Sequence, residues 1–241
     1  MKINKIELKH FVITIFFVTF ALAFDDKKSE FILNSWLLNF LKVLIFVSIT
    51  VIVHYFGHKL AARKYQTEVE HRIWCLSNLL FKKIKKKIPI GIILSLLVSF
   101  FSLGRLFFIA IESITINTKP KRTGFRYPNL MDYEIAIISV AGPLANLILA
   151  LFIKLIGISF LNDLIMINLA YGLFHMIPFS DLDGCKVFFS SFIVYIFTLS
   201  LMLITLLLIS FYSLTTVIIL ALFIAAVFSI IFFLFLFGKH L

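Results

Sequence analysis

Long apolar runs separated by clusters of lysine and arginine constrain this chain more than any other feature of its sequence. A run of about 20 apolar residues is long enough to cross the hydrocarbon core of a bilayer as a helix. Hydrophobic residues make up 61% of the chain and charged residues 15%, whereas soluble domains are about half apolar and a quarter charged. Most of the chain must therefore face lipid, and we expect an all-α polytopic membrane protein.

The apolar runs predict about six spanning helices. They cover residues 11–24, 31–62, 131–161, 164–182, 187–210 and 214–237. The first run follows Lys2, Lys5 and Lys9 and ends at Ala21-Leu22-Ala23, which resembles a signal-peptidase site. Residues 1–23 are therefore interpreted as an uncleaved membrane anchor, with a cleaved signal peptide as the alternative. Either interpretation places the N-terminus in the cytoplasm.

Residues 88–116 form an apolar segment between two basic loops. The second loop carries Lys119, Lys121, Arg122 and Arg126. A single crossing would put these cations outside, against the positive-inside rule, whereas a segment that dips in and returns keeps both loops in the cytoplasm. Residues 113–117 alternate with a period of two, which predicts a short strand. The sequence thus favours a re-entrant segment that ends in a strand shielded by protein or water.

The net charge of +11 does not indicate a nucleic-acid-binding protein, because the basic residues gather in loops beside apolar runs. Loops of this kind contact anionic lipid headgroups. Cys75 and Cys185 form no C-x-x-C motif and read as ordinary thiols. With no repeat and no linker, we predict one membrane-embedded domain over residues 1–241, with a core at 31–186 and a C-terminal helix hairpin at 187–237. Its expected place is the cell membrane, as a multi-pass protein with both termini cytoplasmic.

His54 and His58 lie four residues apart near the end of the second apolar run. On a helix this spacing can point both imidazoles at one metal ion. In zinc proteases the motif is H-E-x-x-H with the Glu as general base, but here the position is Tyr55. His58 precedes Arg63 by five residues, about 7.5 Å along a helix, so the pair lies near the cytoplasmic boundary. Taken alone, the pair could also be two interface histidines bonded to backbone.

Asp183 is the third titratable group that matters. An aspartate inside a spanning segment costs about 2.5–3.5 kcal/mol on insertion scales and needs a partner. If residues 88–116 re-enter, then residues 31–62 and 164–182 deliver His58 and Asp183 to the same side of the membrane. A simple crossing would separate them. The loop charges therefore predict that His54, His58 and Asp183 can meet.

Three motifs occur in a fixed order along this region. They are His54-x-x-x-His58, Ala141-Gly142-Pro143-Leu144-Ala145-Asn146, and Asn168 followed by Pro178-x-x-x-Leu182-Asp183-Gly184. Over residues 51–189 they resemble the core signatures of the site-2 protease family of intramembrane zinc metalloproteases. The resemblance implies zinc held by His54, His58 and Asp183, and a strand-bearing region that holds an unwound substrate helix. It assigns structural or substrate-positioning roles to Pro143, Asn146, Asn168, Pro178 and Gly184. The implied partners are the lipid bilayer and a transmembrane segment of another membrane protein.

Two positions depart from the family pattern. Tyr55 replaces the glutamate, and a phenol with a pKa near 10 is a poor base at neutral pH. General acid–base catalysis is worth about 10²–10⁴ in rate. His175 replaces the asparagine that steadies a developing oxyanion. A histidine there can donate similarly, or can become a fourth ligand and close the site.

Three functions follow as hypotheses. The favoured one is a pseudoprotease, catalytically impaired or inactive, that binds transmembrane segments or regulates an active relative. The second is an active intramembrane zinc protease with an unusual base such as Glu112 or Glu134. The third is an ion or metal transporter that uses His54, His58, His175 and Asp183 as its pathway. The sequence leaves open whether the chain is an enzyme.

Overall fold

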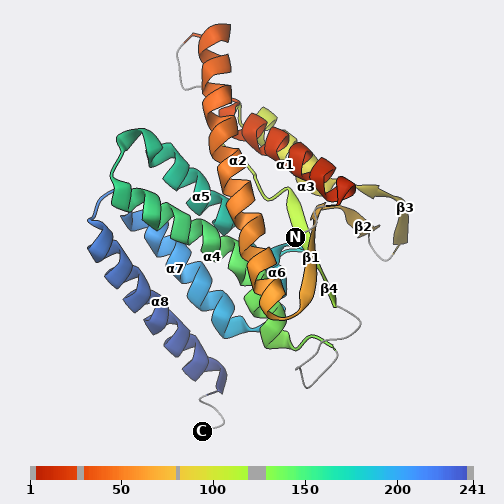
Figure 1. Cartoon of the computed structure of the whole chain (residues 1–241), viewed down its shortest axis with the longest axis vertical. Helices are drawn as coiled ribbons and strands as arrows, with labels where there is room; N and C mark the ends of the chain where they lie inside the picture. Colours follow the sequence, from red (N-terminus) through yellow and green to blue (C-terminus); the bar gives the residue numbers. More distant parts are fainter. Residues whose placement is uncertain (1–3, 26–29, 80–81, 119–128, 238–241) are drawn as a thin grey trace. The chain divides into compact units, whose positions relative to one another are not determined.

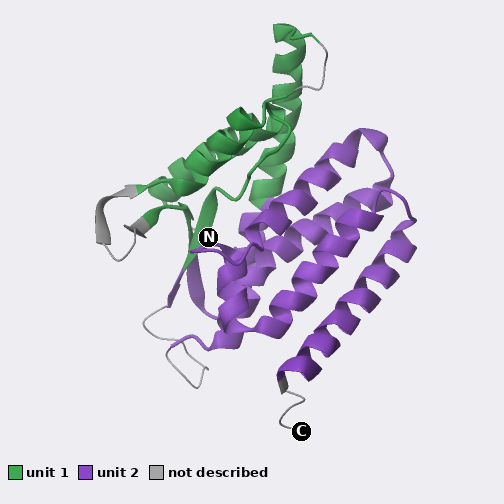
Figure 2. Cartoon of the chain, turned by 180° about the vertical axis from the view of Figure 1, so that it is seen from behind, with its two compact units in different colours: residues 1–52, 70–115 green, residues 53–69, 116–241 purple. Residues whose placement is uncertain are grey.

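The computed structural model describes residues 4–25, 30–79, 82–118 and 129–237. The four cations at 119–126 and both chain ends, whose cytoplasmic location was predicted above, lie outside the described residues. The chain divides into two compact units, coloured separately in Figure 2. Unit 1 comprises residues 1–52 and 70–115, and unit 2 comprises residues 53–69 and 116–241. Each unit is described by itself below.

Helices dominate the described residues, as the sequence predicts. In chain order the elements are α1 (Lys5–Ala23), α2 (Leu33–Lys64), β1 (Thr67–Ile73), β2 (Leu76–Leu79), β3 (Lys82–Ile88), α3 (Ile90–Phe101), β4 (Glu112–Thr118), α4 (Asp132–Ile156), the 3-10 helix η1 (Ser159–Leu161), α5 (Asn162–His175), α6 (Asp183–Ser190), α7 (Phe192–Leu208) and α8 (Leu214–Phe237). Among them α1, α2, α4 and α8 are long and apolar enough to cross a bilayer. The chain is therefore a multi-pass membrane protein.

The structure supports four of the six expected spans by length. α5 has 14 residues and α7 has 17, fewer than the ~20 that a perpendicular crossing needs. The predicted helix at 164–182 ends at His175, because Pro178 cannot continue a helix and restricts the residue before it. The predicted helix at 187–210 is two helices, α6 and α7. Between them Ser191 is extended (φ −159°, ψ 96°) at the N-cap of α7, a position that serine favours.

The strand predicted at residues 113–117 is present within β4. The structure adds three strands, β1, β2 and β3, before α3, in the first of the two basic loops that the sequence predicts. β1 pairs with β4, and β2 pairs antiparallel with β3. The described part of this region is thus strand-rich as well as helical.

In unit 1, α1 packs against α3 through aromatic rings. Phe24 and Phe100 lie edge to face with ring centroids 5.2 Å apart, and Phe20 lies 6.3 Å from the same ring. The predicted signal-peptidase residues Ala21 and Ala23 are 2% and 0% exposed. Both small side chains are therefore part of the packed interior of unit 1.

Three buried polar residues join α1 to the strands of unit 1. The carboxylate of Glu7 on α1 accepts a hydrogen bond from the backbone N–H of His71 on β1 at 3.3 Å. The Nδ1 atom of His71 lies 3.3 Å from Oε1 of Glu112 on β4. All three residues are at most 5% exposed. We refer to them as the Glu7 cluster.

In unit 2, α4 packs against α5, α6 and α7, and α7 packs along α8 (Figure 1). The last turns of α2 also belong to this unit. A Cβ atom on Gly57 would overlap the Ala141 carbonyl and the Ala145 methyl group, so glycine lets α2 approach the backbone of α4. A Cβ atom on Gly172 of α5 would displace the flexible end of the Met202 side chain and would lie 3.3 Å from the Pro143 carbonyl oxygen of α4. Small residues therefore hold the helices that carry the candidate site close together.

Candidate metal centre

The site begins with the ring of His58, which lies against α4. A Cβ atom on Gly142 would occupy the space of the His58 imidazole. One turn earlier on α4, the carbonyl oxygen of Ile138 lies 2.7 Å from Nδ1 of His58. A carbonyl can only accept a hydrogen bond, so Nδ1 of His58 carries the proton and donates it. In the neutral ring Nε2 of His58 therefore has a lone pair.

Three donor atoms converge in this part of unit 2. Nε2 of His54 lies 3.1 Å from Nε2 of His58, and each of these nitrogens lies 3.2 Å from Oδ2 of Asp183. All three residues are at most 1% exposed. Around a tetrahedral zinc ion with ligand distances of about 2.0–2.1 Å, the ligand atoms lie roughly 3.3–3.4 Å apart. The three atoms thus form a nearly equilateral triangle of the size that one metal ion requires.

The lone pair on Nε2 of His58 indicates that a cation belongs in this triangle. Its Nε2 lone pair faces a carboxylate oxygen at 3.2 Å, and two acceptors at that distance repel unless a cation or proton lies between them. Among the described residues, no lysine or arginine forms an ion pair with Asp183. His54, His58 and Asp183 are together one of the groups of side chains that could hold a metal ion. The donor set of two imidazoles and one carboxylate suits zinc.

Asn146 lies beside the other nitrogen of His54. Its Nδ2 atom is 3.3 Å from Nδ1 of His54, and its Oδ1 atom makes no hydrogen bond within the described residues. Both side chains are 0% exposed. Turning the amide by half a rotation exchanges the two atoms and gives Nδ1 of His54 an acceptor. The side chain can then hold His54 with Nε2 unprotonated toward Asp183.

Asp183 begins α6, and the residues on either side position it. Leu182, at the N-cap of α6, is fully buried. A Cβ atom on Gly184 would overlap the backbone of Met176, the residue that caps the end of α5. The chain between α5 and α6 is thereby folded back so that Asp183 faces the histidines. A carboxylate at a helix N-terminus also interacts favourably with the helix dipole.

Tyr55 follows His54 on α2 but faces a different neighbour. Its side chain is 3% exposed, and the ammonium of Lys59 lies 4.9 Å from the centre of its ring. Adjacent residues on a helix project about 100° apart, so Tyr55 does not share the face of His54 and His58. It contributes a phenol where the zinc proteases carry a carboxylate.

His175 is close to His54 but outside the triangle. The two ring centroids are 4.6 Å apart, and Tyr171 lies 4.3 Å from His175 and 5.1 Å from His54. The triad His54, His58 and Asp183 forms without it. Nδ1 of His175 lies 2.9 Å from the carbonyl oxygen of Tyr171, so this nitrogen donates its proton within α5.

The remaining predicted residues have places in the same unit. Asn168 is buried on α5 and donates to the Leu164 carbonyl one turn earlier at 2.8 Å. Pro143 lies inside α4 next to Gly142, and Pro178 lies exposed after the end of α5. Within the described part of the chain, none of the three forms a hydrogen bond with His54, His58 or Asp183. The sequence analysis did not identify Ile138 as a partner of His58, or Gly142 as the residue that leaves space for the His58 ring. Their spacing of four residues on one helix places both on one face.

Glu134, one of the candidate bases, has a structural partner. It lies in the first turn of α4 and its carboxylate accepts a hydrogen bond from the backbone N–H of Met131 at 2.9 Å. Glu134 is 2% exposed. Burial raises the pKa of nearby Tyr65, and Tyr133 and Glu134 add to that effect. Glu134 thus caps a helix near the cytoplasmic end predicted for α4.

A comparison with known protein families identifies the family of this chain. The family model described as Peptidase family M50 matches residues 42–163, just over half of the chain. This chain belongs to peptidase family M50, the site-2 protease family. The match includes His54, His58, Pro143 and Asn146 but ends before His175 and Asp183. No curated protein and no solved structure matches the chain.

Membership in M50 makes the chain an intramembrane metalloprotease-like protein. M50 peptidases are typically zinc-dependent, and the triangle of two imidazole nitrogens and one carboxylate oxygen fits that ion. The predicted resemblance to this family is confirmed.

Proposed function

We propose that this M50 protein binds one zinc ion through His54, His58 and Asp183 and is a pseudoprotease, catalytically impaired or inactive, that binds or regulates transmembrane segments. One observation carries the proposal. Three donor atoms lie 3.1–3.2 Å apart as metal ligands do, while the residue after His54 supplies no carboxylate. A zinc ion bound there supplies Lewis acidity toward a carbonyl oxygen.

Tyr55 accounts for the expected loss of proton transfer. The family's carboxylate at this position is a base, whereas a phenol near pKa 10 is protonated at neutral pH. The Tyr55 ring is also buried under the Lys59 ammonium. A cation over the ring stabilises its position but adds no proton acceptor. Loss of a general base costs about 10²–10⁴ in rate.

His175 supports the same conclusion from the other departure. Its Nδ1–H is donated to the Tyr171 carbonyl, so in the neutral ring Nε2 can accept a hydrogen bond but cannot donate one. The asparagine amide that it replaces is a donor. A neutral His175 therefore cannot steady an oxyanion in the way the family's asparagine does. We propose that it packs beside His54 and does not act as a fourth metal ligand.

The proposed topology places the site near the cytoplasmic face. α3 has 12 residues, or about 18 Å at 1.5 Å per residue, short of the ~30 Å hydrocarbon core. This length supports a re-entrant segment that ends in β4. We further propose about six membrane-crossing segments, with both termini in the cytoplasm. We propose that residues 1–241 act as one membrane domain, with a core at 31–186 and the hairpin at 187–237. The partner is then a transmembrane segment within the lipid bilayer.

The test uses the full chain purified in detergent and reconstituted in liposomes with a model transmembrane substrate. Wild type should contain about one zinc per chain and cleave no substrate. Tyr55→Glu should gain cleavage that a chelator abolishes, by about 10²-fold or more over wild type. Tyr55→Phe is the matched control and should stay inactive.

Two outcomes contradict different parts of the proposal. Wild type without metal would overturn the zinc site itself. Chelator-sensitive cleavage by wild type, at a rate that Tyr55→Glu does not increase, would instead establish an active protease with another base.

A further inference from the structure

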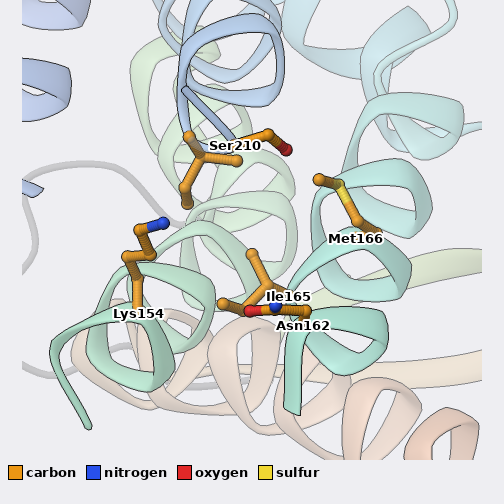
Figure 3. Close-up of a pocket in the computed structure, with 6 residues that line it drawn as sticks. Lys154, Asn162, Ile165, Met166 and Ser210 are labelled. Atoms are coloured by element: carbon orange, nitrogen blue, oxygen red, sulfur yellow. The ribbon is translucent and has the colours of Figure 1, made fainter. Parts of the chain in front are cut away.

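A small cavity lies in unit 2 at one end of its helix bundle. Its volume is about 130 Å³, several times the roughly 10–15 Å³ that one water molecule needs. It is lined by Lys154 of α4, by Asn162, Ile165 and Met166 of α5, and by Ile209 and Ser210 after α7. Figure 3 shows the Lys154 ammonium directed toward the gap that Asn162 and Ser210 border.

The chemistry of this cavity is that of an anion site with an apolar floor. Lys154 is half-buried within the candidate span Asp132–Ile156, and it has no ion pair within the described residues. A cation in a spanning helix is costly unless it reaches water or an anion. Ile165 and Ile209 are 4% and 1% exposed and close the bottom of the cavity. Asp163, the nearest acidic residue in sequence, is exposed and does not line it.

The position of the cavity along the bundle identifies its surroundings. Lys154 lies 16 residues after Ile138 on α4, or about 24 Å along the helix axis. Since the Ile138 carbonyl accepts a hydrogen bond from His58, the proposed topology puts the cavity near the membrane surface opposite the metal triangle. Phe152, Leu155 and Phe160, which are close in sequence to Lys154 or Asn162, are 59%, 68% and 63% exposed. Exposed apolar side chains at this depth face acyl chains, and a lysine there reaches toward headgroups.

We propose that this cavity binds the phosphate group of an anionic phospholipid in the leaflet opposite the metal triangle. Lys154 provides the charge, and the Asn162 amide and Ser210 hydroxyl provide hydrogen bonds. The exposed apolar side chains nearby contact the acyl chains of the same lipid. A free phosphate ion shares the headgroup chemistry but gains nothing from those apolar contacts.

The experiment measures thermal stabilisation of the full chain in detergent during titration with short-chain phosphatidylglycerol, short-chain phosphatidylcholine or inorganic phosphate. Saturable stabilisation by phosphatidylglycerol is expected. Lys154→Gln should weaken it about tenfold, because a hydrogen bond to a charged group is lost, and Lys154→Arg should retain it. Lys42→Gln is the matched control, since Lys42 is also a half-buried lysine in a spanning helix, and it should bind as wild type does.

Each outcome decides one part of the proposal. Equal stabilisation by inorganic phosphate, lost in Lys154→Gln, would identify a free anion as the ligand and overturn the lipid assignment. Equal affinity for phosphatidylcholine would show that the net charge of the headgroup does not contribute to binding, against the proposal. Absence of saturation, or the same loss in Lys42→Gln, would show that no specific site exists.

Discussion

The two units each bury a cluster of histidine and carboxylate side chains, and the clusters differ in geometry. In unit 2 His54, His58 and Asp183 present three donor atoms within 3.1–3.2 Å of one another. In unit 1 Glu7 accepts from the His71 backbone, and the His71 ring lies near Glu112 through Nδ1. All six residues are at most 5% exposed, so burial does not separate the two clusters.

The clusters differ in the group that lies against the Nδ1 atom of the histidine ring. His58 uses Nδ1 to donate to a carbonyl, which leaves Nε2 as a lone pair for a metal. His71 turns Nδ1 to within 3.3 Å of a single carboxylate oxygen of Glu112, so its ring does not converge with a second imidazole on one point. Among the described residues Glu7, His71 and Glu112 do not form a potential metal-binding group. Burial of ionisable groups is therefore weak evidence for a metal, and the direction of the lone pairs is stronger.

The largest expected effect separates the two clusters by metal content. Asp183→Ala and His58→Ala should reduce zinc from about one ion per chain to near background, because the two ligands that remain in either variant cannot hold the ion alone. His71→Ala should keep about one zinc per chain. Elemental analysis of the purified variants measures this directly. Loss of zinc in His71→Ala would mean that the two clusters are not independent.

Gly142→Ala should give the next largest effect. The added methyl group would occupy the space of the His58 ring, so the ring must move and its Nε2 atom leaves the triangle. Overpacking of this kind typically costs about 1–3 kcal/mol, and zinc should be largely lost as well. The control is Gly157→Ala at the end of the same helix. Gly157 has φ +73° but nothing near its Cβ position, so that variant should lose about 1–2 kcal/mol from backbone strain and keep its zinc.

Asn146→Ala should weaken zinc binding without abolishing it. The amide lies against Nδ1 of His54, and partners of this kind typically contribute 10–100-fold in metal affinity. Competition with a chromogenic chelator gives the affinity. Asn146→Asp, which keeps an acceptor for the His54 proton, should bind close to wild type. An unchanged affinity in Asn146→Ala would remove Asn146 from the set of positioning residues.

The sequence predicted much of this arrangement, but not all of it. Apolar runs and loop charges predicted membrane-spanning helices, because segments that face lipid are apolar and the loops beside them are basic. Period-two alternation predicted β4, whereas β3 is so rich in lysine that it reads as a loop. The spacing of His54 and His58 predicted a shared face. The contact between His58 and Gly142 joins residues 84 positions apart, and local pattern carries no information on such packing.

The smallest expected effect comes from the Glu7 cluster and tests α1 as a retained anchor. Glu7→Ala removes the acceptor for the buried His71 N–H, which should lower the stability of unit 1 by about 1–3 kcal/mol. Zinc content should not change, because no triad residue belongs to unit 1. Glu7→Gln keeps a carbonyl acceptor and should recover most of the loss. Thermal unfolding measures the stability, and the intact mass of the membrane-extracted protein shows whether residues 1–23 are present. An intact mass that matches a chain starting after Ala23 would show that α1 is removed. The Glu7 cluster would then have no role in the mature protein.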